Sequence, residues 1–221
     1  KWGMAANDRW VGNPMLNPEQ HHQIDFSIGQ RKTGFNWNTV LFYDKVTDYI
    51  LRDAARSQAS VLLADNADIY RNVDASLYGI EWEGSWSINR SLDVSGSLAY
   101  VHSDNDTDDR AIAQTPPLNG ILQLDYRQSG WGLGTRLRVA DQQNRVDSLS
   151  KQEVSETAGY GALDLYSNYR VNQTFSLRFG IDNLLDKAYA QHINRANVMD
   201  MQAIKVNEPG RNIWLKVDAE F

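Results

Sequence analysis

The sequence contains no cysteine, and this excludes disulfide bonds and thiol catalysis. It also contains no run that approaches the roughly 18 consecutive apolar residues of a membrane-spanning helix. Basic residues are fewer than acidic ones, 22 Lys and Arg against 28 Asp and Glu. This balance argues against nucleic acid as a partner, because neutralising phosphates requires clustered Lys and Arg.

Signals for processing and for catalysis are also missing. The first residue is Lys1, with no initiator methionine and no signal peptide, so we expect a processed product or a fragment. No Ser/His/Asp constellation has nucleophile spacing, and no glycine-rich phosphate loop occurs. We therefore do not expect an enzyme, and we expect no resident cofactor.

Strict alternation of side-chain character is what the sequence does contain. In residues 212–221 every odd-numbered side chain is apolar, and every even-numbered one is polar or charged apart from Trp214. Successive side chains of a strand point to opposite faces. The chain ends on an aromatic residue, Phe221, in the middle of this pattern. A strand with lipid on one face and water on the other needs such a pattern over its whole length.

Eight further segments with this alternation precede the terminal one, giving about nine predicted strands. They lie near residues 19–30, 35–43, 78–88, 92–100, 118–127, 131–139, 163–171 and 175–182. Short turns are predicted at 30–33, 89–90, 129–130 and 172–173, and long polar loops at 51–68, 103–116, 141–158 and 186–206. Short turns on one rim and long loops on the other are typical of outer-membrane β-barrels.

A soluble antiparallel sandwich is the alternative that also gives alternation. Two observations favour the membrane barrel over it. Aromatic residues lie near strand ends on the apolar face, as in an interfacial girdle (Tyr43, Trp82, Tyr100, Tyr126, Trp131). The polar face has too many charges for a dry core but suits a wet lumen (Glu81, Glu83, Arg136, Arg138, Arg170, Arg178).

The odd number of strands has a consequence for closure. A barrel from one bacterial chain has an even number of antiparallel strands, so nine cannot close alone. We therefore predict an all-β fold, an antiparallel transmembrane β-barrel segment, with residues 1–221 as the C-terminal part of a larger barrel.

Two motifs near the end carry a family resemblance. The stretch Asn183-Leu-Leu-Asp-Lys187, followed by Asn207-Glu-Pro-Gly-Arg211 and a terminal Phe, resembles the end of TonB-dependent outer-membrane receptors. Leu185 stands where Phe is more usual, and Ala219 is smaller than the usual apolar residue. The motif residues to which we assign a structural role are Asn183, Leu184, Asp186, Pro209, Gly210, Arg211 and Phe221.

This resemblance implies a barrel of about 22 strands whose lumen holds an N-terminal plug domain. The plug and the N-terminal strands would lie outside these 221 residues. It further implies the outer membrane of a Gram-negative bacterium as the location, with lipid and lipopolysaccharide around the barrel. Uptake of a scarce metal or metal complex, energised by the TonB complex of the inner membrane, is the implied function.

The residues 189–196 are similar to the copper-receptor branch of this family, so copper is the expected cargo. Ferric-siderophore receptors also end with Asn-Glu-Pro-Gly-Arg, and a siderophore receptor is the first alternative. A general porin-type barrel and a soluble β-sandwich binding module are the further alternatives.

Two sets of residues are candidates for contact with cargo or plug. His192, Met199 and Met201 in the last long loop have the imidazole and thioether groups that copper prefers, although they could also be ordinary loop residues. Arg136, Arg138 and Arg178 could bind plug carboxylates or an anionic siderophore, or pair with Asp and Glu of the same face. The acidic loop Asp104–Asp109 is predicted to be solvated.

Overall fold

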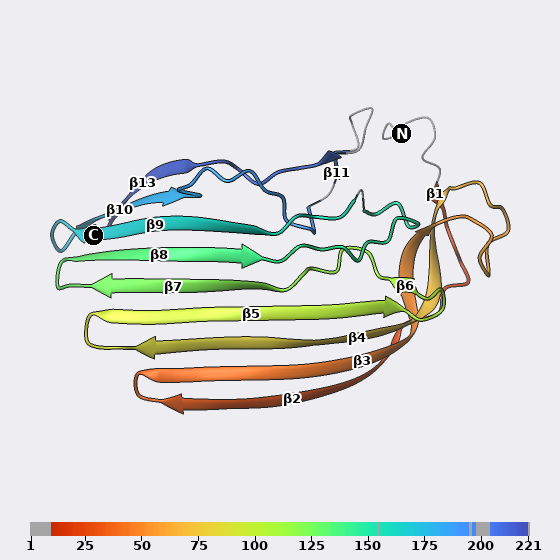
Figure 1. Ribbon diagram of the computed structural model, residues 1–221, viewed down its shortest axis with the longest axis horizontal. Helices are drawn as coiled ribbons and strands as arrows, with labels where there is room; N and C mark the ends of the chain where they lie inside the picture. The colour runs from red at the N-terminus through yellow and green to blue at the C-terminus, as the bar shows by residue number, and fades with distance from the viewer. Residues whose placement is uncertain (1–9, 154, 195, 198–203, 221) are drawn as a thin grey trace.

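The computed structural model describes residues 10–153, 155–194, 196–197 and 204–220 (Figure 1). Every regular element in these residues is a β-strand. Correspondingly, none of them forms a helix long and apolar enough to cross a membrane.

Nine long strands form one antiparallel sheet in which each strand pairs with its neighbours in sequence, in the order β2-β3-β4-β5-β7-β8-β9-β10-β13 (Figure 1). Their bounds are β2 (Gln20–Lys32), β3 (Phe35–Ala54), β4 (Asp68–Ser87), β5 (Leu92–Asn105), β7 (Asn119–Arg127), β8 (Trp131–Ala140), β9 (Tyr160–Arg170), β10 (Phe175–Asp182) and β13 (Asn212–Ala219). The predicted nine-stranded antiparallel sheet is confirmed. Among the described residues β2 does not pair with β13, so this sheet is open.

Four short strands complete the described chain. β1 (Trp10–Val11) pairs in parallel with the start of β4, and β6 (Arg110–Ala111) pairs with the end of β5. β11 (Ala196–Asn197) and β12 (Ile204–Lys205) form a separate two-stranded ladder.

The connections lie on two rims, as predicted. Short turns occupy one rim, and the long loops that follow β3, β5, β8 and β10 gather at the other (Figure 1). The first short turn lies slightly later than predicted, at 33–34 instead of near 30–33, because β2 continues to Lys32. Gly34 has a φ of 76°, a conformation that glycine adopts without strain.

The first long loop is shorter than predicted. β3 continues to Ala54 and β4 begins at Asp68, so the loop comprises residues 55–67 instead of 51–68. A β-bulge between Val46 and Tyr49 shifts the register of this pair. The bulge inserts an extra residue and reverses the phase of alternation, and this explains why the pattern ended early.

The apolar face of the sheet is exposed along its length. Ile24, Phe26 and Leu215 expose 73%, 59% and 67% of their surface. Exposure of so many large apolar side chains in one continuous face is expected of a surface that contacts lipid.

Aromatic side chains mark both borders of this apolar face. On β3, Phe35 lies opposite Trp86 near the short turns, and Tyr43 lies opposite Tyr78 near the long loops. The eight residue-to-residue steps from Phe35 to Tyr43 span roughly 27 Å along the strand at about 3.4 Å per step. Because barrel strands tilt by about 35–45°, this length corresponds to a height of about 19–22 Å, close to the roughly 25 Å expected of the apolar band of a membrane barrel.

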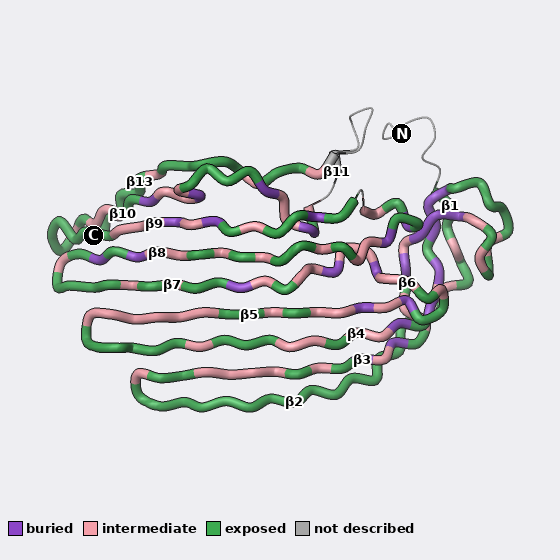
Figure 2. Tube along the Cα trace, in the orientation of Figure 1, coloured by how far each residue is buried: buried purple, intermediate pink, exposed green. Residues whose placement is uncertain are grey.

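The buried core lies under the long loops and not in the middle of the sheet. Four side chains in the parts of β3 and β4 nearest the long loops are at most 3% exposed: Val46, Leu51, Val73 and Ala75 (Figure 2). Ile112 from the loop after β5 packs against Val46 and Ala75. The long loops therefore fold over the outer ends of β3 and β4.

Candidate functional site

Paired charges occupy the polar face of β8 and β9. Asp164, only 1% exposed, accepts hydrogen bonds from Arg136 Nε at 2.9 Å and from Arg138 Nε and Nη2 at 3.1 and 3.0 Å. Arg138 Nη1 also donates to the Tyr189 hydroxyl at 3.1 Å, so its guanidinium is largely engaged within the chain. Arg136 uses only Nε in its contact with Asp164, and 41% of its side chain is exposed. The carboxylate of Asp164 thus binds both Arg136 and Arg138.

The motif residue Asn183 connects this charge cluster to the loop after β10. Its backbone N–H donates to Asp164 Oδ1 at 2.8 Å, and its side-chain amide binds the backbone of Lys187 and the carbonyl of Pro209. The φ of Asn183 is 51°, in the left-handed region where Asn is enriched. Asn183 is 2% exposed, and its role is to hold the two ends of this loop together.

The other motif residues fasten the same junction. Asp186 Oδ1 accepts the backbone N–H of Arg211 at 2.8 Å. A Cβ atom at Gly210 would lie 2.9 Å from Asp186 Oδ1, so a larger residue would displace this contact. Leu184 extends the pairing with β9 through a 2.7 Å backbone hydrogen bond to Leu163. Phe221 lies outside the described residues.

A hollow of about 1050 Å³ lies on the polar face between β8 and β13, toward the short-turn rim. Among its lining residues are Gln123, Arg136, Tyr166, Asn168, Arg178 and Trp214. Arg178 donates to Asp218 from Nε and Nη2 at 2.9 and 3.1 Å, and Lys216 contacts the same carboxylate at 3.0 Å. Apart from the hydrogen bond between Arg138 and Tyr189, pairing with carboxylates of the same face accounts for the contacts that Arg136, Arg138 and Arg178 make in the described residues.

Two aromatic rings in this face lie over glycines of neighbouring strands. A Cβ at Gly134 would lie 2.2 Å from the ring of Tyr166, and a Cβ at Gly180 would lie 2.2 Å from the ring of Trp214. Tyr166 reaches past Gly134 and donates its hydroxyl to Asp125 Oδ1 at 2.8 Å. Because Gly134 and Gly180 have no side chain, the rings of Tyr166 and Trp214 can lie directly against the backbone of the neighbouring strand.

His192 is buried and both of its ring nitrogens have partners. Nδ1 lies 2.8 Å from Thr157 Oγ1, and Nε2 lies 2.6 Å from Glu153 Oε1. A metal ion at His192 would have to displace one of these partners. Met199 and Met201 lie outside the described residues. Within the described chain, no group of three or more His, Asp or Glu side chains is arranged to hold a metal ion.

Glu153 links three loops through one carboxylate. Besides His192, it accepts the backbone N–H groups of Gln114 at 2.5 Å and Asp147 at 2.6 Å. Burial opposes the ionisation of Glu153, but the hydrogen bonds from His192 and the two backbone amides outweigh it and lower the pKa of this carboxyl below its usual 4.5.

The prediction of a solvated acidic loop at Asp104–Asp109 was wrong for several of its carboxylates. Asp106 pairs with Lys45 at 2.6 Å, and Asp108 pairs with Arg110 and Arg71. Lys45 and Arg71 come from β3 and β4, and a local reading of charge spacing does not take such distant partners into account. A larger cluster around Asp53 also had no sequence signal, because its members are far apart in the chain.

Comparison with known proteins was made at the level of family, sequence and structure. A family model described as TonB dependent receptor-like, beta-barrel, matches residues 3–184. A hemin receptor of Yersinia pestis is 25% identical over 201 residues, which cover 85% of this chain and 28% of that protein. An iron-regulated outer membrane virulence protein of Vibrio cholerae serotype O1 is 24% identical over 234 residues, which cover 100% of this chain and 34% of that protein.

Solved structures give the same fold. The copper transporter OprC matches with a TM-score of 0.83 and 31% identity, covering 94% of this chain and 32% of that one. A ferric enterobactin receptor of Pseudomonas aeruginosa matches with a TM-score of 0.72 and 20% identity, covering 92% of this chain and 31% of that one. This chain therefore spans about a third of the length of the proteins it matches.

Proposed function

The chain belongs to the TonB-dependent receptor-like β-barrel family, and on that premise we propose that it is the C-terminal part of an outer-membrane receptor that takes up a scarce metal or metal complex. The exposed apolar face contacts lipid, and the polar face lines the lumen. TonB-dependent receptors are transporters and not enzymes. The remaining barrel strands, a plug domain in the lumen and the TonB complex of the inner membrane are the partners that this proposal requires.

We propose copper as the cargo. The observation that carries this proposal is the 31% identity to the copper transporter OprC over 94% of the chain, against 20% for the ferric enterobactin receptor over 92%. Met199 and Met201 are the proposed thioether ligands, with His192 as a third ligand if it leaves Glu153. Iron complexes are the second candidate, because the hemin receptor and the iron-regulated virulence protein are related over most of the chain.

Calorimetry on the full-length receptor tests the choice of cargo. We expect copper to bind and a ferric siderophore or hemin not to bind. Tight binding of a siderophore or hemin without copper binding would overturn the copper proposal and leave the receptor proposal intact. A double variant, Met199→Leu with Met201→Leu, is expected to weaken copper binding. Met15→Leu is the matched control, because Met15 is 82% exposed in another segment.

We also propose Arg136 and Arg178 as contacts for a carboxylate of the plug or for an anionic cargo. Asp164 neutralises one of its two arginines, and Asp218 faces both Arg178 and Lys216. Each cluster thus has one positive charge in excess. The terminal nitrogens of Arg136 have no hydrogen-bond partner among the described residues, so they can make the planar two-point contact that arginine forms with carboxylates.

A further inference from the structure

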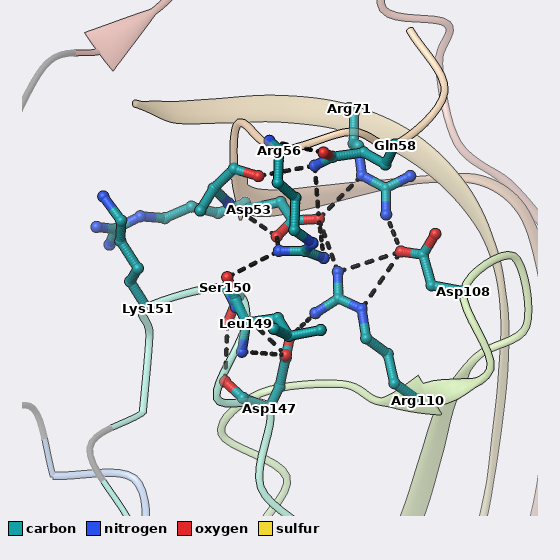
Figure 3. Close-up of polar contacts among 12 residues, drawn as sticks. Asp53, Arg56, Gln58, Arg71, Asp108, Arg110, Asp147, Leu149, Ser150 and Lys151 are labelled. Carbon is teal, nitrogen blue, oxygen red and sulfur yellow. Dashed lines mark hydrogen bonds and ion pairs between the residues drawn. The ribbon is translucent and has the colours of Figure 1, made fainter. Parts of the chain in front are cut away.

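The outer ends of β3 and β4 carry a buried carboxylate surrounded by three arginines (Figure 3). Asp53, with no exposed surface, accepts hydrogen bonds from Arg71 Nε at 3.0 Å and from Arg110 Nη2 at 2.6 Å. Arg56 Nη1 donates to the other carboxylate oxygen at 2.9 Å. These arginines come from the loop after β3, from β4 and from β6, so one carboxylate connects three segments.

Arg110 connects this cluster to the loop after β8. Besides Asp53, its guanidinium contacts Asp108 at 3.1 Å and pairs with Asp147 (Figure 3). The three carboxylates belong to β3, to the loop after β5 and to the loop after β8. The Arg110 side chain is 11% exposed and that of Asp147 is 1% exposed.

Direct contacts between the loop after β3 and the loop after β8 reinforce this arrangement. Arg56 Nη1 donates to the backbone carbonyl of Leu149 at 2.8 Å. Lys151 Nζ donates to the backbone carbonyl of Asn66, and Gln152 Nε2 donates to the backbone carbonyl of Arg52, near the end of β3, at 2.8 Å. The two loops are about 93 residues apart in sequence at the first of these contacts, so tertiary folding alone brings them together.

Burial and charge balance make this cluster more than a set of surface ion pairs. Three arginines (Arg56, Arg71, Arg110) face three aspartates (Asp53, Asp108, Asp147), so the charges balance. An exposed pair stabilises by only about 0–1 kcal/mol. Removing one partner of a buried pair is strongly destabilising, because the other charge is left buried and uncompensated. The segments are therefore expected to separate together or not at all.

We propose that residues 55–67, 106–118 and 141–153 form one rigid cap over the rim on which the long loops lie, with Arg110 as the central residue of this cap. Cargo then reaches the lumen by movement of other loops against this cap, and not by independent movement of these three. This proposal does not depend on the identity of the cargo.

Hydrogen exchange of the full-length receptor, with and without Arg110→Met, tests the proposal. Three backbone N–H groups report on the three segments: Asn66 donates to Ala55, Asp108 to Asn105 and Ser150 to Asp147. We expect exchange to accelerate by about tenfold or more in all three segments, because the loss of one guanidinium unbalances the whole buried cluster. Acceleration confined to residues 106–118, or none at all, would overturn the proposal.

The matched control is Arg127→Met, which removes an arginine that pairs with Asp93 near the opposite rim and is 67% exposed. Exchange in the three cap segments is expected to stay unchanged in this control. Heat-modifiable migration on a gel verifies that each variant forms the barrel. If Arg110→Met does not, Asp147→Asn takes its place: acceleration in all three segments supports the cap, and acceleration within 141–153 alone contradicts it.

Discussion

The backbone N–H of Asn183 donates a 2.8 Å hydrogen bond to the same carboxylate, Asp164, that holds two arginines of the neighbouring strand. The first residue of the loop that follows β10 is thereby attached to the charged face of β8 and β9. The side chain of Asn183 also binds the backbone of Lys187 and of Pro209, so this one residue positions both ends of the loop against the charged face.

The first prediction concerns the stability of this junction. Asn183→Ala removes three side-chain hydrogen bonds at a buried residue with positive φ, and we expect it to lower the free energy of unfolding by about 2 kcal/mol or more. Asn168→Ala is the control, since Asn168 is exposed on the same face, and about 0.5 kcal/mol or less is expected there. Thermal unfolding of the full-length receptor, followed by heat-modifiable migration, measures both. Equal effects would contradict the role assigned to Asn183.

The second prediction separates Arg138 from Arg136. Arg138 makes two contacts with Asp164 and one with Tyr189, whereas Arg136 makes one contact with Asp164. Arg138→Met is therefore expected to destabilise the receptor by about 2 kcal/mol, and Arg136→Met by less than about 1 kcal/mol. Chemical denaturation in detergent provides the comparison. A larger loss for Arg136→Met would mean that Arg136 has the structural role instead.

The third prediction concerns acid. The pKa of Glu153 is lowered in the folded chain, so its ionised form stabilises the folded loops above the ordinary pKa of 4.5. This stabilisation is lost as the pH falls below 4.5 and through the lower folded pKa. We expect the contact with His192 to loosen in that range, and a spin label at Ile193→Cys to become more mobile. The 221 residues contain no cysteine of their own, so within them the label attaches only at position 193.

The control for the acid prediction is Glu153→Gln in the same labelled chain. It removes the titrating group, and the label is expected to be mobile at neutral pH already and to change little on acidification. A label whose mobility rises below pH 4.5 equally in both chains would exclude Glu153 as the group responsible.

Most of the sheet could be predicted from the sequence because each strand has one apolar and one polar face over its whole length. The outer ends of β3 and β4 could not be predicted, for a local reason. The bulge between Val46 and Tyr49 reverses the phase of alternation, and beyond it residues such as Leu51 and Asp53 are buried under loops. Apolar and charged residues then share one covered face, so alternation no longer distinguishes inside from outside.

The charge clusters could be predicted only in part, because they depend on partners that are distant in sequence. Arg136 and Arg138 were identified as residues of a wet face, and pairing within that face was one of two interpretations. Asp53 meets Arg71 and Arg110 at separations of 18 and 57 residues, and no spacing rule relates them. For His192, residue type alone gave a candidate metal ligand with an ordinary loop residue as the alternative, and its contacts with Thr157 and Glu153 could not be read from the sequence.

Lipid access to the two faces of one strand is the most direct test of the central claim that this sheet is the wall of a membrane barrel. Single cysteines at Leu215, Lys216, Val217 and Asp218 of β13, each with a fluorophore, would be placed in the full-length receptor in vesicles containing brominated acyl chains. We predict strong quenching at Leu215 and Val217, and little at Lys216 and Asp218. Equal quenching at all four positions, or none at Leu215 and Val217, would contradict the assignment of the faces.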